Sequence, residues 1–232
     1  MAIKRYLAMT AAEIQSSDPL PPNIAWMACH FSPYTTGLSN RPRELPPNSL
    51  LILNDVTPIH GHDPELVASQ LSELVEGLGC TGALLDFQRA GYPDTVDLAR
   101  ALIDTLPCPV AVSELYAEGL GCPIFLPPGP LHQSLAEYLG PWQDREVWLE
   151  IALDSEIITL TESGAAISPL AAHSSLEGGH REEALHCHYR IELEENTARF
   201  TLWRTREDLE GLMAEAEKLG ISTAVGLYQE LG

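Results

Sequence analysis

The sequence predicts one α/β domain over residues 1–232, a TIM-like (β/α)8 barrel with some helices short or missing and a β-hairpin before the last helix. Short apolar runs recur along the chain, and most are apolar throughout, which is typical of parallel strands covered on both faces. Amphipathic stretches separate several of these runs, and such alternation favours a parallel sheet with right-handed crossovers. A length of 232 residues suits a single barrel.

Eight apolar runs are expected to form the barrel strands. Turn-forming residues bound most of them, and their lengths are those of ordinary buried strands. They cover residues 4–9, 24–31, 50–56, 82–88, 109–114, 122–127, 147–153 and 223–228.

Four helices are expected between the later strands. The clearest covers residues 64–78, where apolar residues recur at helical spacing, Asp63-Pro64 forms the start and Gly79 the stop. Similar patterns predict helices over residues 94–106, 131–139 and 206–219.

The remaining segments are less regular. Residues 32–49 show no helical stripe, and residues 162–183, rich in Ser, Gly and Ala, are expected to form a loop. Residues 186–190 and 199–204 flank Glu194-Glu195-Asn196, and we expect them to form an antiparallel hairpin.

The charge of the chain excludes two classes of partner. The formal net charge is −20, from 33 acidic and 13 basic residues, so the chain is not expected to bind nucleic acid or anionic membranes. The acidity predicts a soluble, mutually repelling surface, or else a site for neutral or cationic ligands such as sugars. The sequence gives no prediction of the oligomeric state.

Targeting and cysteine patterns indicate a cytoplasmic protein. We see no signal peptide at the N-terminus and no apolar stretch of membrane-spanning length. The five cysteines are odd in number and lack metal-ligand spacing, so we expect reduced thiols.

The most informative stretch is residues 81–88, which read Thr-Gly-Ala-Leu-Leu-Asp-Phe-Gln. They predict a buried strand that ends by presenting Asp86 and Gln88. Barrel enzymes place their chemistry at the C-terminal ends of strands, so both residues are candidate site residues. The alternative is that they cap backbone groups of the next loop.

Carboxylates and amides also follow other strands. Asn54 and Asp55 end one strand, Glu114 ends another, and Glu150 lies on a third. Asp86 with Asp55, Glu114 or Glu150 is a candidate acid/base pair, because neighbouring acids raise one another's pKa.

Aromatic residues at strand ends are candidates for stacking on sugar rings. Trp26, Tyr116 and Tyr228 occupy such positions, although aromatics there equally often close the core.

No metal or cofactor is predicted. The HxH pairs at residues 60–62 and 186–188 suit two metal ligands, but further ligands are not evident, so structural roles are expected. No P-loop, GxGxxG or nucleophile elbow is present.

The order of these pieces resembles the family 18 glycoside hydrolases, the chitinase-like barrels. That family's fourth strand reads DGxDxDxE, and residues 81–88 lie over it without a gap. Gly82, Asp86 and the aromatic Phe87 match, whereas Gln88 stands in place of the final Glu. At the end of the last strand, Tyr228 stands where the family usually has a Trp under the sugar.

The resemblance implies a pocket without the family's general acid. In that family the substrate's N-acetyl group attacks the anomeric carbon, the Glu protonates the leaving oxygen, and the Asp orients the acetamide. Gln88 has no carboxyl proton to donate, but its amide can hydrogen-bond a sugar. We therefore expect an inactive barrel that binds an N-acetylglucosamine-type oligosaccharide. The alternative is a hydrolase that uses a different carboxylate pair.

Overall fold

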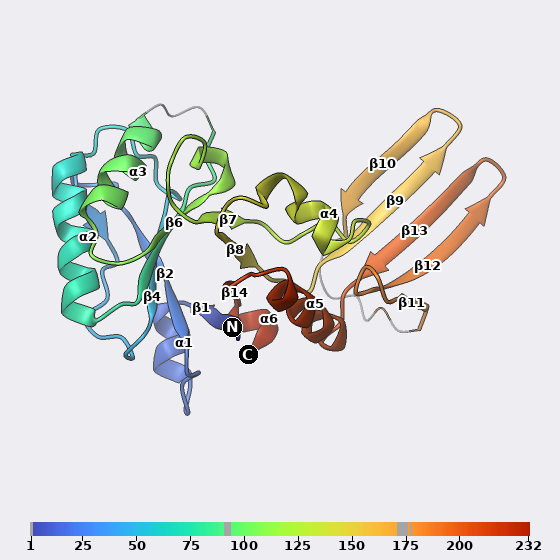
Figure 1. The fold of residues 1–232 in the computed structure, drawn as a ribbon, viewed down its shortest axis with the longest axis horizontal. Helices are drawn as coiled ribbons and strands as arrows, with labels where there is room; N and C mark the ends of the chain where they lie inside the picture. Colours follow the sequence, from blue (N-terminus) through green and yellow to red (C-terminus); the bar gives the residue numbers. More distant parts are fainter. Residues whose placement is uncertain (1, 91–93, 171–175, 177) are drawn as a thin grey trace.

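The computed structural model describes residues 2–90, 94–170, 176 and 178–232. Its main feature is a closed barrel of eight parallel strands, which confirms the predicted fold (Figure 1). The strands are β1 (Lys4–Met9), β2 (Ile24–Phe31), β4 (Leu50–Asn54), β5 (Gly82–Asp86), β6 (Val110–Ser113), β7 (Ile124–Leu126), β8 (Val147–Glu150) and β14 (Thr223–Leu227). Each pairs with its neighbour in this order, and β1 pairs with both β14 and β2, which closes the barrel.

Several strands end earlier than their apolar runs predict. Glu114 begins a 3-10 helix, η1 (Glu114–Tyr116), and Tyr228 begins the short helix α6 (Tyr228–Leu231). The end of each strand is set by how far its neighbours remain within hydrogen-bonding distance. The composition of a single strand does not show this distance.

Alternate residues of the strands fill the barrel interior, as the two-residue period of a strand requires. The buried inward-facing residues are Tyr6, Ala8, Ala25, Leu50, Ile52, Leu84, Ala111, Phe125, Trp148 and Val225. Gly82 makes room for them: a Cβ there would lie 2.9 Å from Leu50 Cδ2 and 3.0 Å from Trp148 Cη2. The interior is therefore a packed core rather than a pore.

Helices cover part of the outside of the barrel. The long ones are α2 (Pro64–Leu78), α3 (Asp94–Thr105) and α5 (Arg206–Lys218), close to the predicted ranges. Elsewhere the connections hold short elements: α1 (Ala11–Ser16), β3 (Leu38–Ser39), η1, α4 (Leu135–Leu139) and η2 (Gly140–Trp142). The barrel therefore has short and missing helices, as predicted.

One predicted helix is shorter than expected. Residues 131–139 were expected to be helical, but α4 begins only after Ser134. The Ser134 side chain accepts from the Glu137 backbone, and the Glu137 carboxylate accepts from the Ser134 N–H. This capping box sets the helix start.

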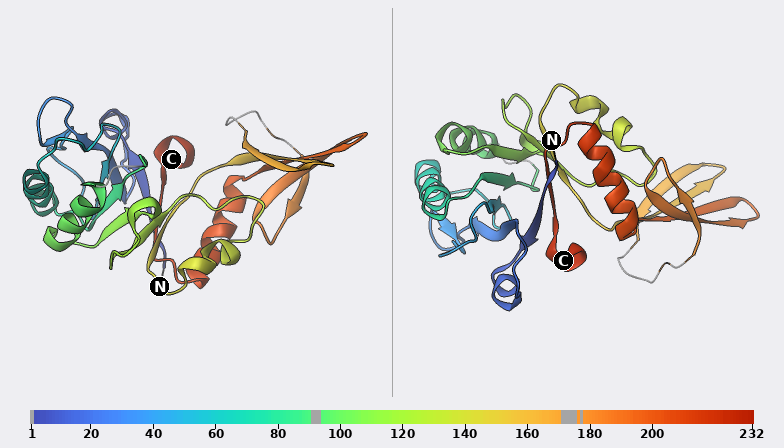
Figure 2. Two further views of the ribbon diagram at one scale, coloured as in Figure 1. Left: turned by 90° about the horizontal axis from the view of Figure 1, so that it is seen from above. Right: turned by 60° about the horizontal axis from the view of Figure 1, so that its bottom comes forward.

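A five-stranded antiparallel sheet is inserted between β8 and α5, in the order β10-β9-β13-β12-β11. Its strands are β9 (Ser155–Thr161), β10 (Gly164–Pro169), β11 (His180–Glu182), β12 (Cys187–Glu194) and β13 (Thr197–Trp203). The β12–β13 pair confirms the predicted hairpin. Figures 1 and 2 show the sheet projecting away from the barrel.

The prediction of a loop over residues 162–183 is wrong in part. β10 pairs with β9, and β11 pairs with β12. Residues 171–175 and 177 lie outside the described residues. The local composition favours a loop, but cross-strand pairing with β9 holds β10 in the sheet, and such long-range contacts override local propensity.

Two further properties follow from the fold. All five cysteines are free thiols, and burial raises the pKa of Cys29 to about 12. Within the described ranges, no helix combines the length and the apolar character that crossing a membrane requires.

Candidate functional site

A cavity of about 570 Å³ lies where the barrel strands end, a size usual for small-molecule sites. Most of the surface that lines the cavity is apolar, but several polar side chains line it as well. The lining residues are Ala8, Met27, Ala28, His30, Asn40, Ile52, Asn54, Asp55, Val56, Leu84, Asp86, Gln88, Arg89, Phe125, Glu150, Val225, Gly226 and Leu227. Asn54, Asp86 and Glu150 are the last residues of β4, β5 and β8 and lie two positions beyond the interior core residues Ile52, Leu84 and Trp148.

Asp86 is held by Gln88, in the loop after β5, and by Ser113 at the end of β6. The Gln88 amide donates to Asp86 Oδ1 at 2.6 Å, and the Ser113 hydroxyl lies 3.4 Å from the same oxygen. Burial and the charge of Asp55 raise the pKa of Asp86, although the hydrogen bonds from Gln88 and Ser113 oppose the shift. Gln88 therefore orients the carboxyl that the sequence singles out.

The pKa of Glu150 is raised more than that of Asp86. Burial raises its pKa to about 7, and the negative charges of Asp86, Asp154 and Glu230 add to the effect. Glu150 also lines a second, smaller hollow of about 240 Å³, together with Gln88 and Glu114. Near neutral pH, Glu150 can therefore either donate or accept a proton.

Replacing Glu150 with glutamine is expected to stabilise the fold at alkaline pH. The carboxyl has a pKa of about 7 in the folded chain against its ordinary value of 4.5, so it lowers stability as the pH rises from 4.5 through 7. The gain at pH 8 is expected to be about 1–3 kcal/mol. Below pH 4.5 the carboxyl is protonated in both states, and the gain disappears. Urea unfolding at pH 4 and pH 8 measures it, and equal differences at both pH values would contradict the shift.

Asp55 lies at the cavity wall, and its carboxylate caps the loop that follows β5. Asp55 is only 4% exposed, and its two oxygens accept the backbone N–H groups of Gln88 at 3.0 Å and Arg89 at 2.8 Å. The Arg89 guanidinium in turn donates hydrogen bonds to the backbone oxygens of Asp55 and Val56. Asp55 therefore fixes the position of Gln88 and Arg89.

The Asn54 side chain also forms hydrogen bonds with backbone groups beside the cavity. Its amide donates to the Met27 carbonyl at 2.9 Å, and its carbonyl accepts from the Val56 N–H at 3.2 Å. Asn54 therefore ties β2, β4 and the following loop together at the rim.

The three candidate aromatics lie outside the residues that line the cavity. Trp26 is buried, and its indole N–H donates to the Asn40 carbonyl. Tyr116 is buried against Phe87, and its hydroxyl donates to the Arg89 carbonyl.

Tyr228 accepts a hydrogen bond from the Ser17 hydroxyl. The residue before it, Leu227, presents the last inward-facing side chain of β14.

The remaining candidate, Glu114, is exposed at the start of η1 and lines only the smaller hollow. The cavity instead contains three polar residues that were not predicted: Arg89, His30 and Asn40. Arg89 directly follows Gln88, so its position after the strand was a usable signal. His30 lies near the end of β2, a predicted strand, so its position was also a usable signal. Asn40 belongs to residues 32–49, which showed no helical pattern.

Three of the four HxH histidines have protein partners, and His60 is exposed. Both ring nitrogens of His62 lie within 2.9 Å of backbone oxygens, those of Ile59 and Ser32. His186 pairs with Glu215, and His188 pairs with Asp208. In the part of the chain that the structure describes, no group of three or more His, Cys, Asp or Glu residues is placed to hold a metal ion.

The fold and the cavity define a TIM-like (β/α)8 barrel with a five-stranded β insertion before the last helix. Two solved structures of similar fold are the chitinase from Chromobacterium violaceum ATCC 12472 and the spore cortex-lytic enzyme SleL of Bacillus cereus. The chitinase has a TM-score of 0.60 and 10% identity, over 99% of this chain and 95% of that chain. SleL has a TM-score of 0.56 and 9% identity, over 100% of this chain and 71% of that chain.

SleL of Bacillus megaterium QM B1551 is similar as well, with a TM-score of 0.53 and 9% identity over 97% of this chain and 70% of that chain. No protein-family model matches the sequence, and no curated protein matches it. At such low identity the likeness concerns the fold.

Proposed function

We propose that this protein binds an N-acetylglucosamine-type oligosaccharide in the barrel cavity and does not hydrolyse it by the family 18 mechanism. The observation that carries the proposal is the Gln88–Asp86 hydrogen bond of 2.6 Å at the cavity wall. The Asp that orients the acetamide in that family has a counterpart here, but the group beside it is an amide. An amide donates hydrogen bonds but does not act as a general acid.

The surroundings of this pair support a polar, uncharged ligand. Asn40, Gln88 and His30 offer hydrogen-bonding groups, and Met27, Phe125 and Leu227 offer apolar surface. A pyranose ring presents hydroxyls at its edge and C–H groups on its faces, so it needs both kinds of contact.

Calorimetric titration with N-acetylglucosamine oligomers, together with a hydrolysis assay, tests this proposal. Wild type is expected to bind without turnover, and Asp86→Ala is expected to weaken binding by about tenfold, the loss of one good hydrogen bond. Asp97→Ala, an exposed aspartate on α3, is the matched control and should bind as wild type does. Absence of binding to any oligomer would contradict the proposal.

Gln88→Glu is expected to create turnover in this barrel. The substitution supplies a carboxyl beside Asp86, and general acid catalysis contributes about 10²- to 10⁴-fold to the rate. The measurement is the release of a chromogenic aglycone by Gln88→Glu and wild type. Rapid turnover by wild type that Asp86→Ala abolishes would show that the native site is already an enzyme.

A hydrolase that uses Glu150 as its acid is the second candidate function, and the pKa of about 7 favours it. Glu150 would donate its proton to the glycosidic oxygen as the C–O bond breaks, and Asp86 would stabilise the positive charge on the sugar. A water molecule would then form the new C–O bond at the anomeric carbon and return a proton to Glu150. Of the three alternative partners for Asp86, Glu150 is the best placed. Asp55 is engaged with two backbone N–H groups, and Glu114 faces the smaller hollow. Turnover by wild type that Glu150→Gln abolishes would favour this candidate.

A further inference from the structure

The inserted sheet has one apolar face that is largely exposed. Residues directly opposite each other in antiparallel strands point to the same face, so the register defines two rows across the four long strands. The first row is Ile167, Ile158, Phe200 and Ile191, and the second is Ala165, Leu160, Ala198 and Leu193. We call these eight residues the apolar face.

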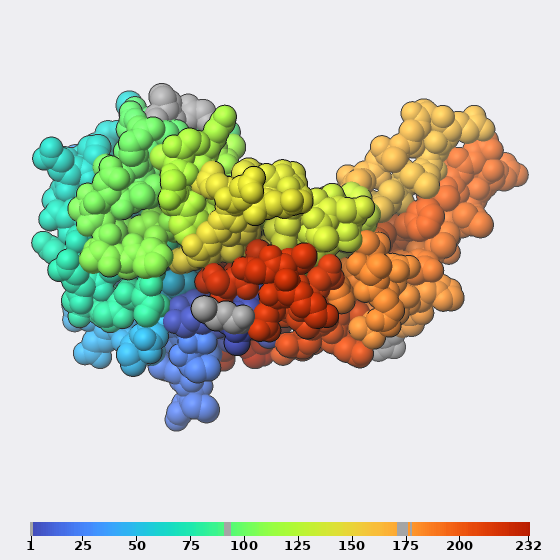
Figure 3. Space-filling model, viewed as in Figure 1, coloured from blue at the N-terminus to red at the C-terminus, as the bar shows by residue number. Residues whose placement is uncertain are grey.

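The side chains of this face remain accessible. Leu193 is 78% exposed, Ile167 is 52% exposed and Ile191 is 45% exposed. The base of the sheet is packed around the buried residues Leu131, Cys187 and Leu202, and Ile158 and Phe200 of the apolar face lie partly against this cluster. Figure 3 shows the outer ends of the sheet standing clear of the barrel.

Charge indicates what kind of partner fits. The chain carries a net charge of −20, but none of the eight residues of the apolar face is charged. Two copies of the chain repel each other over most of their surfaces, and the apolar face is a place where they can touch without opposing charges of the same sign. Such a face is also complementary to itself, as a two-fold interface requires.

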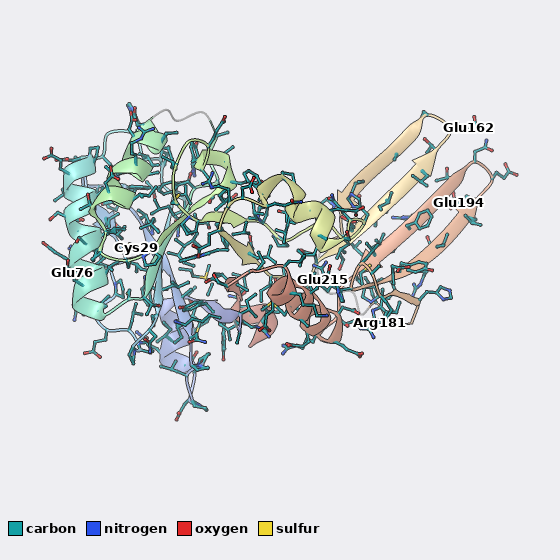
Figure 4. The ribbon with its side chains drawn as sticks, viewed as in Figure 1. Cys29, Glu76, Glu162, Arg181, Glu194 and Glu215 are labelled. Carbon is teal, nitrogen blue, oxygen red and sulfur yellow. The ribbon has the colours of Figure 1, made fainter. Side chains whose placement is uncertain are left out.

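The turns at the outer ends of the sheet set the direction of the pairing. Glu162 lies beyond β9 and Glu194 ends β12, and Figure 4 shows both at the far ends of the hairpins. If the two sheets pointed the same way, these acidic ends would meet. An arrangement with the ends pointing in opposite directions keeps them apart.

The sizes of the side chains suit packing of one sheet against another. The second row alternates small and large residues, in the order Ala165, Leu160, Ala198 and Leu193. Its alanines leave hollows that the large residues of a facing row can fill. From ordinary strand spacing the face covers roughly 250–300 Å² per copy, so the interface is expected to be small, weak and reversible.

We propose that two copies of this protein associate through their apolar faces, sheet against sheet, with the hairpin ends pointing in opposite directions. Sedimentation velocity over a concentration series tests this, with an expected dimer Kd of about 10–100 µM. Ile167→Lys is expected to raise the Kd by about tenfold or more, since the symmetric interface contains the substituted side chain twice.

Ser168→Lys is the matched control, because Ser168 neighbours Ile167 on the same exposed strand but points to the opposite face. It should dimerise as wild type does, and equal thermal unfolding midpoints establish that both variants are folded. Leu193→Lys should weaken the dimer as well. A wild type that stays monomeric at about 200 µM, well above that Kd, would overturn the proposal. So would a dimer that Ile167→Lys breaks but Leu193→Lys preserves, because that result indicates pairing along the β10 edge.

Discussion

Replacing Asp208 with alanine is expected to lower the free energy of unfolding by about 3–5 kcal/mol. Asp208 is fully buried on α5, at 0% exposure. It accepts hydrogen bonds from the Thr205 hydroxyl at 2.6 Å, from His188 Nδ1 at 2.8 Å and from Arg181 Nε at 3.1 Å. Alanine would leave these donors without their acceptor and would loosen the inserted sheet from α5.

The pKa of Asp208 is consistent with this role. Burial by itself raises the pKa, but the hydrogen bonds from Thr205 and His188 outweigh burial, so the pKa lies below its ordinary value of 3.8. The corresponding stability is therefore present above pH 3.8 and is lost as the pH falls through the lower folded-state pKa.

Urea unfolding at neutral pH measures the effect of Asp208→Ala. Asp97→Ala is the matched control, because Asp97 forms an ion pair of similar length with Arg100 at an exposed site. Its loss is expected to stay below about 1 kcal/mol. Equal losses in the two variants would contradict the role of Asp208 in fastening the sheet. Figure 4 labels two other residues of this junction, Glu215 on α5 and Arg181 on β11.

Replacing Asp55 with alanine is expected to cost about 2–4 kcal/mol of stability and to weaken ligand binding in the cavity. The variant leaves the backbone N–H groups of Gln88 and Arg89 without their acceptors. Because these groups fix the loop that presents the Gln88 amide, Asp55→Ala is expected to speed amide hydrogen exchange at Gln88 and Arg89.

Asp63→Ala is the control for this variant. Asp63 also accepts two backbone N–H groups, those of Glu65 and Leu66, but it does so at the start of α2, away from the cavity. Losing this cap is expected to cost about 1 kcal/mol and to leave the Gln88 and Arg89 amides unchanged. Unaltered exchange at Gln88 in Asp55→Ala would show that other contacts hold the loop.

Local sequence signals were sufficient to predict the positions of most strands and helices of the barrel. Helix α2 begins and ends where Asp63-Pro64 and Gly79 predict, because these residues form the cap and the left-handed stop themselves. Such interactions span only a few residues, so the sequence displays them directly. The extents of β10 and α4 were missed, because long-range pairing in one case and a competing cap in the other decided them.

The candidate site was predicted less completely than the fold. Asn54, Asp55, Asp86, Gln88 and Glu150 line one cavity, and each stands at or next to a strand end as the barrel order implies. The aromatics Trp26, Tyr116 and Tyr228 lie elsewhere. For Tyr228 the reason is the two-residue strand period: Leu227 points inward, and helix α6 starts at the next residue.

The sequence by itself determined the order of strands and the presence of an amide, Gln88, two residues after Asp86 at a strand end. Both depend on residue identity and short-range spacing. Only the tertiary structure decided that Glu150 shares a cavity with Asp86 and that burial, together with the charge of Asp86, raises the pKa of Glu150 to about 7. It also decided that eight apolar residues of the insertion share one largely exposed face. Burial, charge proximity and cross-strand register join residues far apart in the chain, and no local pattern encodes those distances.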